Sequence, residues 1–389
     1  MKGKPAFRLM PGLLMVVIIS CVTGCATTGL ESARHDYYRG DYRAAAADLD
    51  TQTYPQRDRV LFKMERGTIR QAAGNYDGSN RDFISAYDDI AAMTAIQVVQ
   101  DTGSLVVNDT VQDYRGAPFE RTMLHAFTAK NHLMLANFEN AAVEARRIIE
   151  SLKPEVRGDY PEDAYSRYMA GFCLGLMGDW SNAALQYRLA AQLAPQLAID
   201  ERSGFIAPAG NQPASSGDTS HELVVFVLIG RSPSGQELLN QRRPYQPAGY
   251  ADIIIDGTRA GRSYQLADTV ELAFTTQQKD AIKEAAKTVT RVAMKEIAAH
   301  QIDQHNEALG ALFRIIMIGL LEQPDIRRWE TLPRSLQVAR VPCPENPREI
   351  SVRFNTRAGS PQRTIPLTQP LPRRGNTYIA IVRDTQPVY

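Results

Sequence analysis

A three-residue motif that recurs four times in the first half of the chain constrains the fold more than any other sequence feature. Each copy is a small, a polar and an aromatic residue in succession, at residues 40–42, 74–76, 136–138 and 178–180. A small residue follows five positions after the start of each copy, and nine positions after it comes a residue that can fill a groove between helices. This spacing predicts two helices joined by a tight turn, with the aromatic residue packed between them. The motif residues are Gly40, Tyr42, Gly74, Tyr76, Ala136, Phe138, Gly178 and Trp180.

The fourth copy matches a known repeat pattern most completely, because its residues stand at the offsets of the tetratricopeptide repeat. The first interval between copies is 34 residues, the length of one such repeat, whereas the later intervals of 62 and 42 residues indicate insertions near 101–118 and 153–161. We therefore expect residues 31–201 to form an all-α, tetratricopeptide-like helical solenoid. The alternative is an unrelated antiparallel helical bundle. The matching residues are Gly171, Leu174, Gly178, Ala183, Tyr187 and Pro195.

Polar residues of this helical region are candidates for partner binding, because such solenoids bind peptides or proteins on their concave face. The alternative for each candidate is a solvated position on a helix. His125 and His132 lie seven residues apart near Glu120. We expect these histidines to pack rather than to bind a metal, because no cysteine or acidic ligand stands at the usual short spacing. The partner-binding candidates are Asn131, Arg146, Arg147 and Arg167.

The sequence pattern changes after residue 201. Residues 202–221 are rich in Gly, Pro and Ser, a composition typical of an exposed linker. The apolar run Leu223–Ile229 predicts a buried strand. Residues 222–389 are thus expected to form a mainly antiparallel α+β domain with a long helix over 275–323, which makes the whole chain α+β. Further strands are expected at residues 252–255, 265–272, 336–341, 349–354, 363–367 and 377–383.

The expected long helix carries a basic residue at every fourth position. This row could face lipid phosphates or an acidic partner, or it could be a solvated face that is paired with neighbouring acidic residues. The apolar stretch Leu309–Leu321 in the same helix is too short to cross a bilayer and predicts a core helix. The basic row consists of Lys279, Lys283, Lys287, Arg291 and Lys295.

Residues 324–333 connect this helix to the next strand and include Asp325, Arg327 and Trp329. Asp325 can pair with Arg327, and a guanidinium can cover the indole of Trp329. These residues predict a fixed structural corner, with a ligand site as the alternative.

The first 25 residues have the features of an export signal. Three basic residues precede the apolar run Leu9–Val22, which is too short to span a bilayer comfortably. Gly24 and Cys25 follow, and this junction resembles the lipobox of bacterial lipoproteins. The resemblance implies that Cys25 is diacylated on sulfur and becomes the mature N-terminus. Ala26 at the next position implies the outer membrane of a double-membraned bacterium, with the protein facing the periplasm, and residues 25–30 are expected to form a lipidated tether.

Removal of the expected signal, residues 1–24, changes the charge balance. The whole chain has 44 basic and 43 acidic residues, and the signal contains three of the basic residues and no acidic ones. The remaining 41 basic and 43 acidic residues give a net charge of −2. This balance argues against nucleic acid as a partner, because binding to phosphates requires a basic surplus or a basic face.

The chain resembles a family of uncharacterised bacterial outer-membrane lipoproteins with tetratricopeptide-like repeats. The resemblance includes residues 141–147 and 178–187, and it departs from the family at Ser234 and Gly235, where a basic residue is common. It implies a lipoprotein without established catalytic activity and an association with envelope proteins that accompany activators of cell-wall synthesis. The other matching residues are Asn108, Asp109, Tyr114, Glu120, His125, Asp325, Arg327, Trp329, Leu332 and Pro333.

The sequence contains no phosphate-binding loop and no serine nucleophile elbow, and Gly257–Gly261 is better interpreted as a turn. Glu296 and His300, four residues apart and followed by His305, indicate a metal site only weakly. Cys173 and Cys343 could form one disulfide, although two separate buried thiols are expected. We therefore expect a non-enzymatic scaffold that binds envelope proteins and needs no cofactor or metal. The alternative is a factor that binds peptidoglycan or surface polysaccharide directly.

Overall fold

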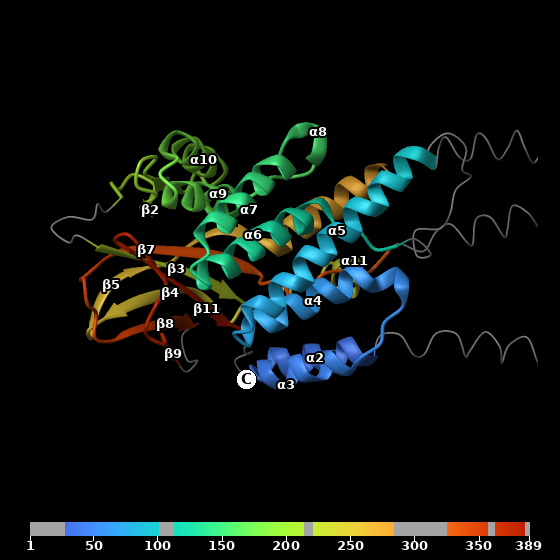
Figure 1. Ribbon diagram of the computed structural model, residues 1–389, viewed down its shortest axis with the longest axis horizontal. Helices are drawn as coiled ribbons and strands as arrows, with labels where there is room; N and C mark the ends of the chain where they lie inside the picture. Colours follow the sequence, from blue (N-terminus) through green and yellow to red (C-terminus); the bar gives the residue numbers. More distant parts are fainter. Residues whose placement is uncertain (1–27, 101–112, 214–220, 284–324, 357–361, 386–389) are drawn as a thin grey trace, which may run out of the picture.

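The computed structural model describes residues 28–100, 113–213, 221–283, 325–356 and 362–385. It is a mixed α+β fold, with helices in the first half of the sequence and sheets later (Figure 1). The expected signal with Cys25, the second half of the linker and residues 284–324 lie outside the described residues.

The helices of the first half form four hairpins: α2 with α3, α4 with α5, α6 with α7, and α9 with α10. Successive hairpins pack against one another along the row (Figure 1). The helices are α2 (Thr28–Tyr38), α3 (Tyr42–Thr51), α4 (Arg59–Ala72), α5 (Tyr76–Gln100), α6 (Pro118–Met134), α7 (Phe138–Ser151), α8 (Pro154–Arg157), α9 (Ala164–Leu176) and α10 (Trp180–Leu193), with a short 3-10 helix at Gln56–Asp58.

The recurring motif lies at the turn of each hairpin, as the sequence predicts. Its first residue has a positive φ, between 53° at Ala136 and 84° at Gly40, which ends one helix in the left-handed conformation. The polar residue then caps the next helix in three copies; Asp41, for example, accepts a hydrogen bond from the backbone of Ala44. The aromatic residue begins that helix. The residues five and nine positions on are buried in every copy: Ala45, Ser79, Ala141, Ala183, Leu49, Phe83, Ala145 and Tyr187.

Two details of the helical prediction are wrong. Trp180 does not pack between its two helices, because it is 65% exposed. Its position at the first turn of α10 places it over Gly175 at the end of the hairpin, where no further helix covers it among the described residues. The tether is also shorter than predicted, because α2 already begins at Thr28.

The second half forms two sheets. The five-stranded sheet has the order β10-β11-β3-β7-β6 and the four-stranded sheet has the order β5-β4-β8-β9. Pairing is antiparallel except between β3 and β11, which are parallel. The strands are β3 (His221–Ile229), β4 (Ala248–Ile255), β5 (Thr258–Arg262), β6 (Tyr264–Asp268), β7 (Ser335–Cys343), β8 (Ile350–Thr356), β9 (Arg363–Pro366), β10 (Arg373–Arg374) and β11 (Thr377–Asp384); a short helix, α11 (Gly235–Leu239), follows β3.

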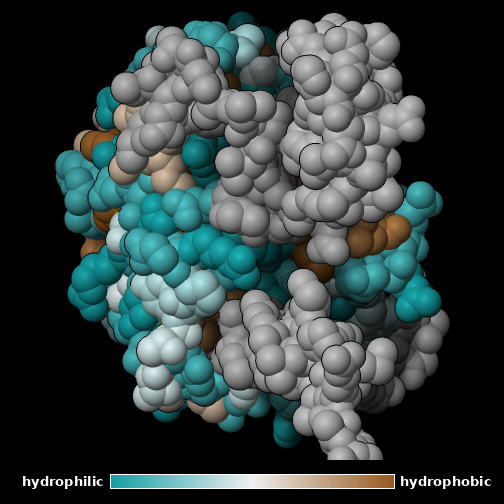
Figure 2. Space-filling model, turned by 90° about the vertical axis from the view of Figure 1, so that its right-hand side faces the viewer, coloured by the Kyte–Doolittle hydropathy of each residue, from teal (hydrophilic) through white to brown (hydrophobic). Residues whose placement is uncertain are grey.

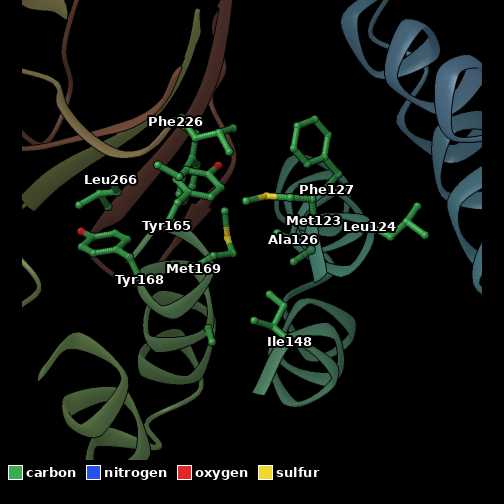
Figure 3. Close-up of a cluster of buried hydrophobic side chains, with 14 of the residues drawn as sticks. Met123, Leu124, Ala126, Phe127, Ile148, Tyr165, Tyr168, Met169, Phe226 and Leu266 are labelled. Carbon is green, nitrogen blue, oxygen red and sulfur yellow. The ribbon is translucent and has the colours of Figure 1, made fainter. Parts of the chain in front are cut away.

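Strand β3 explains how the helices and sheets join. Its residues alternate between two cores, so that Val224 and Phe226 face the helices while Val225 and Val227 face the four-stranded sheet. The ring of Phe226 packs against Phe172 of α9 at 5.5 Å between centroids. Figure 3 shows this core, in which Phe226 of β3 lies next to Tyr165 of α9, and helices α6 and α7 lie beside α9. The five-stranded sheet is therefore a middle layer that is buried on both faces, which is why β3 is apolar along its whole length.

Two boundaries differ from the sequence prediction. Residues 202–213 are not a free linker, because Ile206–Pro208 form strand β2, which pairs with β1 (Leu197–Ile199), and Phe205 is buried. The strand expected at 265–272 ends at Asp268, and residues 269–283 are helical, so this helix begins six residues earlier than expected. The turn predicted over Gly257–Gly261 is shorter than expected: Asp256 and Gly257 have positive φ and join β4 to β5, but residues 258–261 belong to strand β5.

Candidate functional site

The segment that connects to β7, residues 325–334, lies against the helices of the first half. Trp329 is completely buried there. Its indole ring lies 5.7 Å from the ring of Phe83 on α5 and 5.6 Å from the ring of Phe127 on α6, and its Nε1 donates a hydrogen bond of 2.9 Å to the hydroxyl of Thr68 on α4. The sequence analysis predicted that a guanidinium could cover the indole of Trp329, but the two phenylalanine rings cover it instead.

Two buried glutamates hold the backbone of this segment. Glu120 accepts hydrogen bonds from the backbone nitrogen of Trp329 at 3.0 Å and from the hydroxyl of Tyr114 at 2.5 Å. Glu65 accepts from the backbone nitrogens of residues 330 and 331 at 2.8 and 3.3 Å, and it also pairs with Arg34 at 2.6 Å. The helices thus bind three consecutive amides of a segment without regular secondary structure, residues 329–331, which turns at residues 330 and 331.

Further contacts fix both ends of the segment. Asp325 accepts two hydrogen bonds from the guanidinium of Arg327, which also reaches Asp58 at 2.8 Å. The hydroxyl of Tyr37 on α2 donates to the carbonyl of Thr331 at 3.0 Å. The structural interpretation of Asp325, Arg327 and Trp329 as a fixed corner is therefore the one that the geometry supports.

Electrostatics keep Arg34 charged at this contact, whereas burial works against the charge of Glu330. Burial alone would lower the pKa of Arg34, but Glu65 and Glu330 raise it above its usual value. Burial raises the pKa of Glu330. Arg34 therefore remains a cation beside the carboxylate of Glu65.

A glycine allows α11 to approach this segment. A Cβ atom on Gly235 would overlap the carbonyl oxygen of Ile326. A side chain there would push the segment away from α11.

The four partner-binding candidates do not share a face. Asn131 is completely buried, because it accepts a hydrogen bond from Gln71 at 2.7 Å and donates one to Ser79 at 2.8 Å. Arg167 is 8% exposed and is held by Glu162 and Gln186. These two residues pack the helices together and cannot contact a partner.

Arg146 and Arg147 remain at the surface of α7. Arg146 is exposed, whereas Arg147 pairs with Glu144 at 2.8 Å and lies over the ring of Tyr87. Arg146 continues an exposed stripe on α7 that includes Glu139 and Val143, spaced four and three residues apart. We call these three residues the α7 stripe.

The predicted packing role of the histidines agrees with their contacts. His125 is buried and its Nδ1 lies 2.8 Å from a carboxylate oxygen of Glu144. Burial lowers the pKa of His132. Within the described residues, no cluster of three or more metal-binding side chains occurs. Glu296, His300 and His305 lie outside that part of the chain. Cys173 and Cys343 are separate buried thiols, as expected.

The described part of the basic row is occupied by contacts within the chain. Lys279 and Lys283 both pair with Asp159, at 3.5 and 2.9 Å, and the ammonium of Lys283 also lies over the ring of Tyr160. Both lysines therefore contact the loop between α8 and α9. The remaining basic residues, from Lys287 onward, lie outside the described residues.

An open cavity of about 670 Å³ lies between α5, α6, α7 and α8. Its apolar residues include Tyr87, Ile90, Pro118 and Val156, and Arg121 also lines it. A second cavity of about 620 Å³ lies beside the bound segment, between α2 and the start of α11. The coloured part of the surface in Figure 2 is mainly hydrophilic, with hydrophobic residues in separate patches.

The sequence alone does not identify Glu65 and Tyr37 as residues of the site. They contact a segment that is 265 or more residues away in the chain, and no local pattern marks such a contact. Only Glu120 was notable in the sequence, through the resemblance.

No protein-family model matches the chain, and no curated protein matches it. Among the described residues, no helix is both long and apolar enough to span a membrane.

Proposed function

We propose that this protein is a lipoprotein of the bacterial outer membrane that acts as a scaffold for another envelope protein, without a catalytic centre or cofactor. The signal-like N-terminus and the lipobox-like Gly24-Cys25 support the anchor. Helix α2 begins three residues after Cys25. At about 3.5 Å per residue, lipid on Cys25 would keep the start of α2 within roughly 10 Å of the membrane surface.

The helix hairpins support a tetratricopeptide-like array as the binding unit. All four copies of the motif have the same role at a hairpin turn, and the helices pack in sequence order. Arrays of this kind bind extended peptides and proteins rather than perform chemistry.

The observation that carries the proposal is the binding of residues 329–331 by Glu65 and Glu120. These carboxylates accept hydrogen bonds from backbone amides, and the indole of Trp329 fills an aromatic pocket. The helices therefore use the chemistry of peptide recognition, with main-chain hydrogen bonds for affinity and a side-chain pocket for specificity.

Because the chain's own segment fills this site, the partner needs another surface. Of the four predicted partner-binding residues, Arg146 belongs to the α7 stripe, and Glu139 and Val143 are additions that the structure suggests. Val143 is 42% exposed and Arg146 lies one turn further along the helix. An exposed apolar residue beside an arginine is a common arrangement in protein interfaces.

Affinity purification of the full-length lipoprotein from crosslinked envelopes tests the proposal. We expect a specific protein to be recovered with the wild type and to be lost when Val143→Asp and Arg146→Glu are combined. The matched control is Arg188→Glu, at an arginine on α10 that is 52% exposed. Equal recovery by all three proteins would exclude the α7 stripe. Recovery of peptidoglycan without a protein would contradict the scaffold and support direct cell-wall binding.

A further inference from the structure

The cavity between α5, α6, α7 and α8 has the character of a small-molecule site. Its volume of about 670 Å³ falls in the range of ligand pockets, which are about 300–1,000 Å³. Side chains from four helices line it, and apolar and aromatic residues lie beside polar and charged ones. Such a lining can orient a ligand that has an apolar body and a polar end.

Arg121 is the polar group that distinguishes this cavity. It lies one turn into α6, where its backbone nitrogen donates a hydrogen bond to the carbonyl of Ala117, but its guanidinium makes no hydrogen bond or ion pair with any residue that the structure describes. Burial lowers its pKa. An arginine that is partly withdrawn from water and lacks an anion gains from binding one, since a guanidinium forms two parallel hydrogen bonds with a carboxylate.

The other arginines of the cavity already have acidic partners. Arg147 pairs with Glu144 at 2.8 Å, and Arg157 lies 3.3 Å from Glu162. Glu150 and Glu155, which also line the cavity, are exposed. Arg121 is thus the arginine of the lining whose guanidinium has no acidic partner among the described residues, and a single guanidinium matches a single carboxylate.

The apolar residues of the cavity indicate the rest of the ligand. Ile90 is buried at its wall, and the ring of Tyr87 packs against the ring of His125 at 4.6 Å. Val156 of α8 is 50% exposed and stands on the opposite side of the cavity lining. An aliphatic or aromatic body would cover these side chains while its charged end reaches Arg121.

We infer that this cavity binds a small amphipathic carboxylic acid, with its carboxylate on Arg121 and its apolar body against Tyr87, Ile90 and Val156. The site is separate from the α7 stripe, because none of Glu139, Val143 and Arg146 lines the cavity. The inference therefore does not depend on the scaffold proposal.

Isothermal titration calorimetry on the full-length protein in lipid nanodiscs tests this site, with 4-phenylbutyrate as the probe and empty nanodiscs as the blank. The uncharged 4-phenylbutanol and the cationic 4-phenylbutylamine have the same apolar body. We expect the acid to bind the wild type at least tenfold more tightly than either analogue. We expect Arg121→Gln to remove that preference while Arg146→Gln, outside the cavity, retains it.

If far-UV circular dichroism shows that Arg121→Gln is unfolded, a second variant still tests the inference. Ala91 lies on the exposed side of α5 and lines the cavity, so Ala91→Trp should fill it and abolish binding of both the acid and the alcohol. The inference is overturned if the wild type binds the acid no more tightly than the alcohol. It is also overturned if folded Arg121→Gln binds the acid as the wild type does, or if Ala91→Trp leaves acid binding unchanged.

Discussion

Replacement of Trp329 by alanine tests whether the helices bind the segment 325–334 as the structure describes. Trp329 is fully buried between two phenylalanine rings, and its indole nitrogen donates a hydrogen bond to Thr68. Removal of a buried tryptophan or phenylalanine side chain costs about 3–5 kcal/mol, and a neutral hydrogen bond contributes about 1 kcal/mol of that. We expect Trp329→Ala to lower the free energy of unfolding by about 4 kcal/mol.

The chain provides its own control, because it contains two tryptophans and the other is exposed. Trp180 is 65% exposed, so Trp180→Ala should change the free energy of unfolding by less than about 1 kcal/mol. Urea unfolding of the full-length protein in detergent micelles, followed by far-UV circular dichroism, measures both values. A loss below about 1 kcal/mol for Trp329→Ala, or equal losses for the two variants, would refute the reasoning.

The same variants give a spectroscopic check. In Trp180→Ala the remaining fluorophore is Trp329, which should emit at the short wavelengths of a buried indole. In Trp329→Ala the remaining Trp180 should emit at the longer wavelengths of a solvated one. Matching emission maxima would show that Trp329 is not in the aromatic pocket.

Three other substitutions have expected outcomes in thermal or urea unfolding. Gly235→Ala should destabilise the protein by more than 1 kcal/mol because its methyl group would meet the carbonyl of Ile326, whereas Gly249→Ala, with open space around its Cα, should not. Ala136→Gly should stabilise it by about 1 kcal/mol, because Ala136 has a φ of 53°, which glycine adopts more easily. An unchanged free energy of unfolding would contradict the positive φ at this turn. Burial raises the pKa of Asp163 to about 6 from 3.8, so the folded state binds the proton more tightly and stability falls as the pH rises between these values. Asp163→Asn should therefore raise the free energy of unfolding at pH 7, by up to about 3 kcal/mol, and not at pH 4; an equal effect at both pH values would contradict the raised pKa.

Local patterns in the sequence predicted much of the secondary structure. The motif at residues 40–42 and its three counterparts mark hairpin turns because a positive φ and a helix cap need particular residues, and these needs are visible in the sequence. The apolar run Leu223–Ile229 likewise indicated a buried strand. Its alternation between two cores was not predictable, because a strand that is buried on both faces shows no alternation of polar and apolar residues.

Burial of polar side chains limited the prediction of the candidate site. Asn131 and Arg167 look like surface residues of helices, yet both pack between helices because Gln71, Ser79, Glu162 and other groups satisfy their hydrogen bonds. The prediction for Trp180 failed in the opposite direction: it was expected to be packed between helices, but it is exposed because its hairpin is the last of the row. Such outcomes depend on which element comes next in space, which a local pattern does not contain.

The contact of residues 329–331 with the helices was not predictable for a related reason. Glu65 is an acidic residue within an amphipathic helix, and only the fold brings it to amides 265 residues away. The sequence did mark Trp329 and Arg327 as a corner, because charged and aromatic residues between two elements often fix a junction.

Amide hydrogen exchange of the full-length protein tests the central claim most directly, because residues 329–331 lie outside helices and strands. If Glu120 and Glu65 bind their amides as the structure describes, these three residues should exchange as slowly as strand β3. Glu65→Ala should accelerate exchange at residues 330 and 331 more than in β3. Exchange of all three amides at the rate of an exposed loop would show that the helices do not hold this segment and would contradict the account.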